Sequence, residues 1–187
     1  MPITNIATRS GDKGKTSLWS GERVSKTDLR IQTVGAIDLA LSALGKGHAY
    51  LRAGDDFARE LSDDLIALQY RFTDLMGEIC TSEEKKALYQ EKRVAIADAD
   101  VAKLEAIYEK LREQLDARGK TFENWKVYGE RGEAAAEFYY IRACMRRAEL
   151  MLWSLREAGF TLRDPLLKLV NRLSDVLFYI AVLLEQD

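Results

Sequence analysis

Residues 138–155 have the sequence FYYIRACMRRAELMLWSL, and this stretch decides which class of fold the whole chain is expected to adopt. Its apolar positions recur at steps of three and four residues, which is the spacing of one face of an α-helix. The positions on this face are Phe138, Ile141, Met145, Ala148, Leu152 and Leu155. Such a stripe is typical of a helix that contributes one face to the core of a bundle.

The rest of the chain favours helices too, because proline occurs only at positions 2 and 165. Four further helices are expected: from Thr27 or Asp28 to about Gly45, from Asp55 to Cys80, around Val101 to Leu115, and from Asp164 to about Leu184. Residues 1–27 are expected to be irregular. Residues 81–97 should form a connection with a short turn of helix, and residues 117–132 a loop. The chain is long enough for one core, so the prediction is a single all-α domain over 1–187, a five-helix bundle (28–187) preceded by an arm (1–27).

The last of these helices is apolar on nearly every side, so it should lie centrally or in a subunit interface. Its start at Asp164-Pro165 suggests a capping carboxylate followed by proline at the first helical position. Polar residues interrupt the apolar run at Lys168, Asn171, Arg172 and Asp175. The segment is therefore not expected to span a membrane.

Charge and cysteine content narrow the classes of partner and compartment. A net charge of −2 does not favour nucleic acid as a partner. Cys80 and Cys144 are too few for a disulfide framework, so both are expected to be reduced, buried and hydrophobic in role. Met1–Thr8 lacks the charged and apolar regions of a signal peptide. A cytoplasmic location is the expectation.

The segment Thr8-Arg9-Ser10-Gly11-Asp12-Lys13-Gly14-Lys15-Thr16-Ser17 contains the ingredients of a phosphate site. It is not a Walker A loop, because Arg9 stands where that loop needs its first glycine. Glycines nevertheless let backbone N–H groups approach phosphate oxygens, lysines add charge, and the hydroxyls of Thr16 and Ser17 can donate to oxygen or approach a metal. The segment is thus either a phosphate-binding arm or a solvated basic tail.

A second polar group follows the helix of residues 138–155. Arg142, Arg146 and Glu149 share one side of that helix beside the apolar stripe, and Arg147 adds another guanidinium. The last helix offers Asn171 and Asp175 one turn apart. A lone arginine in such a place usually snorkels or forms an interface ion pair. Several together favour a polyphosphate clamp, because guanidinium groups match phosphate geometry.

Asp38 lies in the first helix among apolar residues, where a buried carboxylate needs a cationic partner. It is either half of a structural salt bridge or part of a reactive site. His48 is the only histidine, so no metal cluster or nucleophilic triad is expected from the sequence. If the protein is an enzyme, a substrate or cofactor must supply the reactive centre.

Together these residues resemble the PduO-type ATP:cob(I)alamin adenosyltransferases. Residues 8–14, Thr16-Ser17, Gly21-Glu22-Arg23-Val24 and Lys26 are similar to the N-terminal signature of that family, and Gly35, Asp38 and residues 42–45 are similar to its first-helix motif. Arg142, residues 146–149 and residues 171–175 are similar to its two C-terminal motifs. The resemblance covers nearly the whole chain in order and spacing.

The resemblance implies a ferritin-like five-helix bundle that assembles as a homotrimer with ATP and Mg²⁺ at the subunit interfaces. The implied reaction moves the 5′-deoxyadenosyl group of ATP to the cobalt of cob(I)alamin or a related corrinoid and releases triphosphate. A transient flavin-type reductase is the implied electron source. The implied catalytic residues are Asp38, Arg142 and Arg146. The implied ATP ligands are Thr8, Arg9, Ser10, Gly11, Asp12, Lys13, Thr16, Ser17, Lys26, Arg146, Arg147, Glu149 and Asn171. The implied corrinoid ligands are Asp38, Trp125, Lys126 and Arg142, with Asp38 and Arg142 as a salt bridge.

The sequence departs from the family pattern mainly on the corrinoid side. Lys126 occupies the place of a phenylalanine that helps to keep the lower ligand off cobalt, and Trp125 is the nearest aromatic substitute. Leu39 and Leu41 stand where Glu and Asn are common, and Tyr139 stands where a histidine is usual. Two hypotheses follow: a working adenosyltransferase with a modified corrinoid pocket, or a relative that binds ATP or a corrinoid for sensing or storage with little catalysis.

Overall fold

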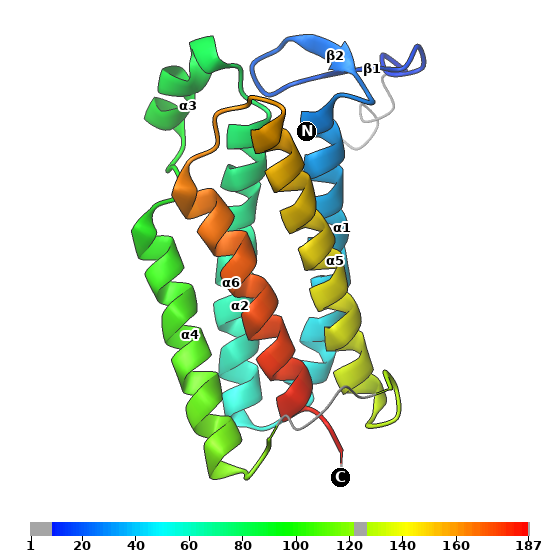
Figure 1. Ribbon diagram of the computed structural model, residues 1–187, viewed down its shortest axis with the longest axis vertical. Coiled ribbons are helices and arrows are strands. Elements are labelled where there is room, and N and C mark those ends of the chain that lie inside the picture. The colour runs from blue at the N-terminus through cyan, green and yellow to red at the C-terminus, as the bar shows by residue number, and fades with distance from the viewer. Residues whose placement is uncertain (1–8, 122–126, 187) are drawn as a thin grey trace.

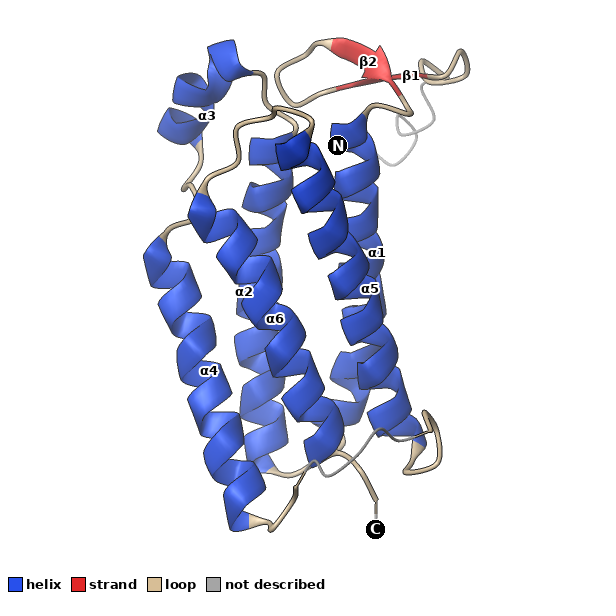
Figure 2. Ribbon diagram, viewed as in Figure 1, coloured by secondary structure: helices blue, strands red, loops and turns tan. Residues whose placement is uncertain are grey.

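The computed structural model describes residues 9–121 and 127–186, and five long helices dominate it (Figure 1). They are α1 (Leu29–Arg52), α2 (Asp56–Ile79), α4 (Asp98–Ala117), α5 (Glu133–Glu157) and α6 (Asp164–Leu183). Shorter elements are strands β1 (Lys15–Ser17) and β2 (Arg23–Ser25), the 3₁₀ turn η2 (Glu83–Lys85) and helix α3 (Lys86–Lys92). The expected five-helix bundle is confirmed, and Figure 2 shows that strands occur only at one end of it.

The five long helices stand side by side. Helix α5 packs between α1 and α6, α6 packs between α5 and α4, and α1 also contacts α2 (Figure 1). Ion pairs such as Lys110–Glu60, at 2.8 Å between Nζ and Oε1, join α4 to α2 and close the ring. Most of α6 is buried, so its predicted central position is confirmed.

The apolar stripe of α5 is buried as predicted, since all six of its side chains are at most 1% exposed. On the facing side of α1, Gly47 allows the two helices to approach closely. A Cβ atom at Gly47 would lie 2.8 Å from Cδ1 of Ile141 and 3.0 Å from Cζ of Phe138. A larger residue there would force the side chains of Ile141 and Phe138 to shift, because protein interiors are packed as densely as organic crystals.

Aspartates cap the first two long helices, and Asp28 is one of the two residues at which the first helix was expected to start. Asp28 and Asp55 cap α1 and α2 by accepting hydrogen bonds from the backbone N–H groups of Arg30 and Ala58. The predicted cap at Asp164 is wrong. Arg163 holds the N-cap position without a side-chain bond, and Asp164 already belongs to the first turn. Its carboxylate instead pairs with Arg156 on α5, at 3.3 Å, because that guanidinium lies within reach.

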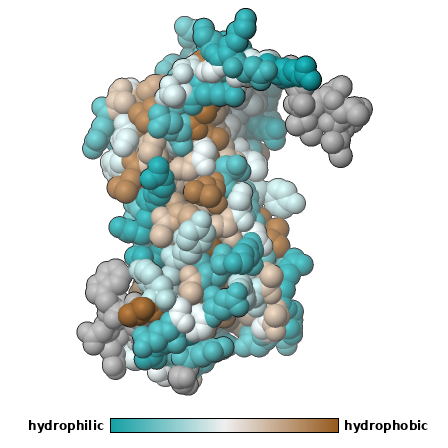
Figure 3. All heavy atoms as spheres, turned by 90° about the vertical axis from the view of Figure 1, so that its right-hand side faces the viewer, coloured by the Kyte–Doolittle hydropathy of each residue, from teal (hydrophilic) through white to brown (hydrophobic). Residues whose placement is uncertain are grey.

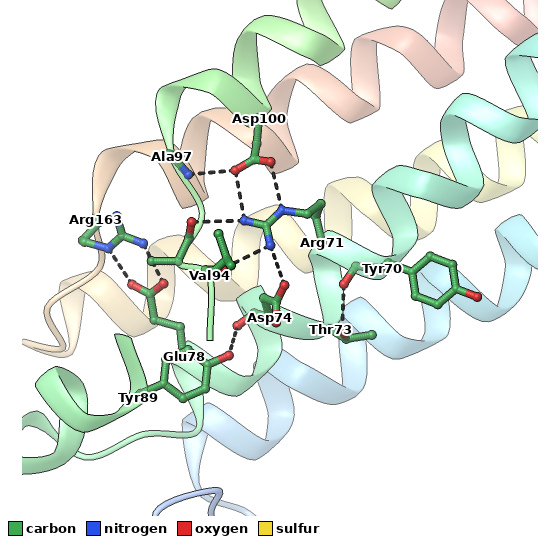
Figure 4. Close-up of polar contacts among 11 residues, drawn as sticks. Tyr70, Arg71, Thr73, Asp74, Glu78, Tyr89, Val94, Ala97, Asp100 and Arg163 are labelled. Carbon is green, nitrogen blue, oxygen red and sulfur yellow. Dashed lines mark hydrogen bonds and ion pairs between the residues drawn. The ribbon is translucent and has the colours of Figure 1, made fainter. Parts of the chain in front are cut away.

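The connection between α2 and α4 contains the expected short helical segment and is held down by a polar network (Figure 4). The Arg71 guanidinium donates to both carboxylate oxygens of Asp100, at 2.9 and 3.1 Å, and to the carbonyl oxygens of Val94 and Ala95. Asp100 also accepts from the Ala97 N–H at 2.9 Å. Arg71 thus fixes the segment that enters α4, because it donates hydrogen bonds to two backbone carbonyls that lie outside any helix.

Asp100 should therefore matter for stability. Burial opposes its ionisation, but the hydrogen bonds from Arg71 and the Ala97 N–H outweigh burial and lower the pKa of the carboxyl below its ordinary value of 3.8. We predict that Asp100→Asn lowers the free energy of unfolding by about 1–3 kcal/mol near neutral pH, measured by urea denaturation. Because the folded-state pKa is the lower one, this difference should be present above about pH 4 and vanish as the pH falls through the folded-state pKa.

The matched control is Asp98→Asn in the same helical turn. The Asp98 side chain is 81% exposed and lies 3.7 Å from Lys168, so its loss should change the free energy of unfolding by less than about 0.5 kcal/mol. Equal losses in the two variants would contradict the structural role given to Asp100.

Candidate functional site

The basic arm forms a short hairpin, which the expectation of an irregular segment missed. Strands β1 and β2 pair antiparallel, with Thr16 opposite Val24. These two β-branched residues are each partly buried, and Gly21 adopts a φ of +89° in the connection. The apolar alternation is only three residues long on each side, which is too short to be recognised as a strand among so many charges.

The glycine-rich stretch before β1 folds into consecutive turns. The N–H of Gly14 donates to the carbonyl of Gly11 at 3.2 Å, and the N–H of Lys26 donates to the carbonyl of Gly14 at 2.9 Å. A Cβ atom at Gly11 would lie 3.0 Å from the Lys26 ammonium nitrogen, so glycine lets that cation lie across the loop. Arg9, Lys13 and Lys15 are also exposed nearby in sequence. The loop and the residues beside it therefore carry several exposed cations, which suit a phosphate ligand.

Arg23 holds this loop together, a role that the sequence did not reveal. Its guanidinium donates to the carbonyl oxygens of Ser10 at 2.6 Å and Lys15 at 3.3 Å, and to the Ser17 hydroxyl at 3.2 Å. The Arg23 guanidinium therefore already uses part of its hydrogen-bonding capacity within the arm. Among the predicted ATP ligands of this segment, Thr8 lies outside the described residues.

The hairpin is anchored at the end of the bundle where α1 begins (Figure 1). The backbone N–H of Trp19 donates to the backbone carbonyl of Cys80 at 2.9 Å. The Trp19 ring meets the Tyr89 ring edge-on, with centroids 4.7 Å apart. The Lys85 ammonium donates to the carbonyl of Ser20 at 2.6 Å. Cys80 follows the last residue of α2 and is only partly buried at this helix end, against the prediction, whereas Cys144 is buried as predicted.

The second predicted group comes together across α5 and α6. The Asn171 amide donates to the Glu149 carboxylate at 2.9 Å, and the Arg172 guanidinium donates to the Asn171 amide oxygen at 3.2 Å. Arg146 and Arg147 precede Glu149 by three and two residues on α5, and both are exposed. Within residues 9–121 and 127–186 neither of these two guanidinium groups has a carboxylate partner, so both are available to an anion.

Two predicted groupings do not form within one chain. In the described part of the chain, no side-chain hydrogen bond or ion pair joins the arm to Glu149 or Asn171. Asp38 is exposed, which corrects the prediction of a buried carboxylate, and it makes no ion pair with Arg142 among these residues. The reason is helical geometry. Ile37 and Ala40 point into the core, whereas Asp38 lies on the opposite side of α1.

Arg142 instead lies in a large groove between α4, α5 and α6. The groove has a volume of about 940 Å³, and the Arg142 guanidinium carbon lies 5.3 Å from the centroid of the Phe178 ring. Its walls are aromatic with charged groups at the rim: Glu105, Ala106, Tyr108, Glu109, Tyr128, Tyr139, Arg142, Arg172, Asp175, Phe178 and Tyr179. Such a cavity suits a large, flat ligand with polar substituents.

The tyrosines of this groove were missed as site residues, although Tyr108 was assigned to the core stripe of its helix. The hydroxyls of Tyr108 and Tyr179 lie 3.0 Å apart, and this hydrogen bond together with burial raises the pKa of Tyr179 to about 12. Burial and a hydrogen bond to Glu185 raise the pKa of Tyr139 as well. The hydroxyls of Tyr139 and Tyr179 therefore stay protonated at neutral pH. Trp125 and Lys126, the predicted corrinoid ligands of the preceding loop, lie outside the described residues.

Neither the histidine nor a cluster of metal-ligating side chains forms a second candidate site among the described residues. His48 bridges Ser62 and Gln69 at 3.0 Å each, inside the α1–α2 packing. Over residues 9–121 and 127–186, no three His, Cys, Asp or Glu side chains gather as a metal site. Nor is any helix in these ranges long and apolar enough to cross a bilayer.

The fold and the two polar regions define a class: a helical bundle with an arginine-bearing helix face beside an aromatic groove. A variant of the PduO-type ATP:corrinoid adenosyltransferase from Lactobacillus reuteri, complexed with cobalamin and ATP, has the same fold. It matches with a TM-score of 0.75 and 21% identity over 95% of this chain and 92% of that one. Residues 6–184 match the model of the family described as cobalamin adenosyltransferase, and this chain belongs to that family.

Two relatives support the assignment. The chain is 31% identical to the corrinoid adenosyltransferase of Citrobacter freundii, over 94% of this chain and 92% of that protein. It is 32% identical to the corrinoid adenosyltransferase PduO of Salmonella typhimurium, over 97% of this chain but only 50% of that protein. The chain thus spans about half the length of the Salmonella relative.

The geometry of the arm predicts a separable role for Arg23. We expect Arg23→Ala to accelerate backbone hydrogen exchange at Gly11–Gly14, because the loop loses the charged donor that joins the carbonyls of Ser10 and Lys15 on either side of these turns. The melting temperature should change by no more than about 2 °C, since the bundle core is untouched. Hydrogen exchange followed by mass spectrometry measures the first effect. Arg59→Ala, at an exposed position of α2, is the control and should leave exchange in the arm unchanged.

Proposed function

We propose that this chain transfers the 5′-deoxyadenosyl group of ATP to the cobalt of a reduced corrinoid. The family and the relatives named above support this activity. The observation that carries it structurally is the position of Arg142 and Arg146 one turn apart on α5. Arg142 lies in the aromatic groove, and Arg146 is exposed beside Glu149 and Asn171. A corrinoid in the groove and a triphosphate on the arginines would therefore be neighbours.

The reaction asks little acid–base chemistry of the protein. Cob(I)alamin supplies an electron pair at cobalt that forms a bond to C5′ of the ribose. The C5′–O bond breaks, its electron pair leaves with triphosphate, and cobalt becomes Co(III). The protein must align the three centres and stabilise the charge that gathers on the triphosphate. Arg146, Arg147 and the lysines of the arm are the groups suited to the second task.

Assembly of several subunits is part of the proposal. No described residue of the arm (9–27) forms a side-chain hydrogen bond or ion pair with Glu149 or Asn171, so a shared ATP site would need the arm of one subunit over the helices of another. Figure 3 shows apolar side chains among the charged ones over the middle of the α1–α5 side. On these two helices, Leu39 of α1 and Leu150 and Trp153 of α5 are 46%, 67% and 43% exposed. We propose a homotrimer in which this side is covered and Asp38 pairs with Arg142 across the boundary.

The remaining partners follow from the same proposal. Mg²⁺ would arrive with ATP, held mainly by phosphate oxygens, with the hydroxyls of Thr16 and Ser17 as the protein groups suited to approach it. A transient flavin-type reductase would supply the electron for cob(II)alamin, and a cytoplasmic location is proposed. Among the described residues, the departures at Leu39, Leu41 and Tyr139, the last of which lines the groove, keep the alternative open: a relative that binds ATP or a corrinoid for sensing or storage with little catalysis.

A direct assay separates the two. The protein is mixed with ATP, Mg²⁺ and chemically reduced cobalamin, and the absorption spectrum of an alkylcobalt species is followed. Appearance of that spectrum at a rate proportional to protein concentration supports the enzyme. ATP binding without any spectral change under strong reductant would support the sensing alternative.

Arg146→Ala should weaken ATP binding by about 1.5–3 kcal/mol, because a triphosphate loses a charged hydrogen-bond donor. Turnover should fall with it. Isothermal titration calorimetry with ATP measures the first effect, and the alkylcobalt assay measures the second. Arg59→Ala, an exposed arginine on α2, is the matched control. Unchanged ATP affinity in Arg146→Ala would show that the triphosphate lies elsewhere.

Asp38→Asn should raise the corrinoid KM more than the ATP KM. The carboxylate is proposed to orient Arg142 in the groove of a neighbouring subunit, whereas the triphosphate binds other groups. Steady-state kinetics with each substrate varied in turn measures the two constants. Asp63→Asn, an exposed aspartate on α2 with a single distant arginine partner, should alter neither KM. Equal increases in both KM values for Asp38→Asn would argue against a role at the corrinoid.

A further inference from the structure

The tail that follows α6 carries a buried glutamate joined to the wall of the groove. Glu185 is 6% exposed and Tyr139 is 8% exposed. The Tyr139 hydroxyl donates a hydrogen bond to Oε1 of Glu185, with 2.7 Å between the oxygens. A buried carboxylate is costly unless it is hydrogen-bonded, so this contact holds the tail and the α5 side chain together.

The same tail ties down both ends of the loop between α4 and α5. The Lys120 ammonium donates to the Glu185 carbonyl at 2.7 Å, and the Gln186 N–H donates to the Arg131 carbonyl at 2.9 Å. Gly132 lies against the Gln186 side chain with a φ of +105°. Figure 1 shows the C-terminal end of the chain beside the start of α5. The tail therefore holds the two flanks of this loop in place.

Tyr139, which the tail holds through Glu185, also contacts two further aromatic rings of the groove. The Tyr139 ring lies next to Tyr128 of the loop, with centroids 5.0 Å apart and ring planes 33° apart. On its other side the Phe178 ring stands edge-on at 6.0 Å, and Arg142 lies over Phe178. The hydroxyl bond to Glu185 restricts rotation of Tyr139, and the position of Tyr139 in turn restricts Tyr128.

Protonation does not disturb this arrangement near neutral pH. Burial and the hydrogen bond to Glu185 raise the pKa of Tyr139, so its hydroxyl remains a donor. The aromatic wall has one preferred orientation before any ligand arrives, which lowers the entropic cost of binding.

We propose that Glu185 is a positioning residue for the corrinoid, acting through Tyr139. It orients the rings of Tyr139 and Tyr128 so that they pack on the flat face of the macrocycle. The inference rests on the proposed function, because it assigns the groove to the corrinoid. Glu185 itself does not contact the ligand, and it has no part in ATP binding.

The test compares Glu185→Ala with Glu185→Gln in the full-length protein. Glutamine keeps an acceptor for the Tyr139 hydroxyl, whereas alanine removes it. We expect Glu185→Ala to raise the corrinoid KM about tenfold, with an ATP KM within about twofold of wild type, and Glu185→Gln to rescue most of the loss. The absorption spectrum of cob(II)alamin bound with ATP should change in Glu185→Ala and return toward wild type in Glu185→Gln.

Two further variants separate positioning from stability. In a Tyr139→Phe background the hydroxyl is already gone, so Glu185→Ala should add no further increase in corrinoid KM. Glu78→Ala, which removes a buried glutamate bonded to Arg163 at 2.7 Å near the other end of the bundle, should lower stability without shifting either KM.

Each result bears on a different claim. Equal increases in both KM values for Glu185→Ala, or a loss of stability with no change in corrinoid KM, would overturn the positioning role. A wild-type protein that binds ATP but neither binds nor alkylates cobalamin would overturn the proposed function instead, whatever the variants do.

Discussion

The apolar stripe of α5 is the constraint on which the site depends. Because six side chains of this helix are buried against α1 and α6, its rotation about its own axis is fixed. Arg142, Arg146 and Glu149 must then lie along the edge next to α6, where Asn171 meets Glu149. The core thus places the polar groups, and a rotated helix would bury charges without partners.

The fixed rotation of α5 also divides the site into two kinds of surface. The arginines above Glu149 are exposed and charged, and they suit an anion, whereas the groove around Phe178 is aromatic and suits a flat apolar ligand. Arg142 lies at the boundary. A reaction between a reduced metal macrocycle and a nucleotide needs such a boundary, because the cobalt face and the triphosphate require opposite environments a short distance apart.

Contacts at the two ends of the bundle hold the basic arm and the loop before α5 in place. At one end, Trp19 and Ser20 dock the basic arm on the α2–α3 junction through backbone carbonyls and a ring contact with Tyr89. At the other end, Glu185 and Gln186 hold the loop before α5. Both anchors use buried polar groups with defined partners, so the loops gain fixed positions without belonging to the apolar core.

Helical periodicity alone determined the five long helices and the buried stripe of α5, since a repeat of three and four residues admits one buried face, but it left α6 either central or in a subunit interface. Local composition likewise indicated the cationic arm and the arginines of α5. Only the tertiary structure decided that Asp38 is exposed, that Arg23 closes the arm, and that Tyr128, Tyr139 and Glu185 meet. These contacts join segments distant in the chain, and no local pattern encodes which distant side chain a buried polar group will find.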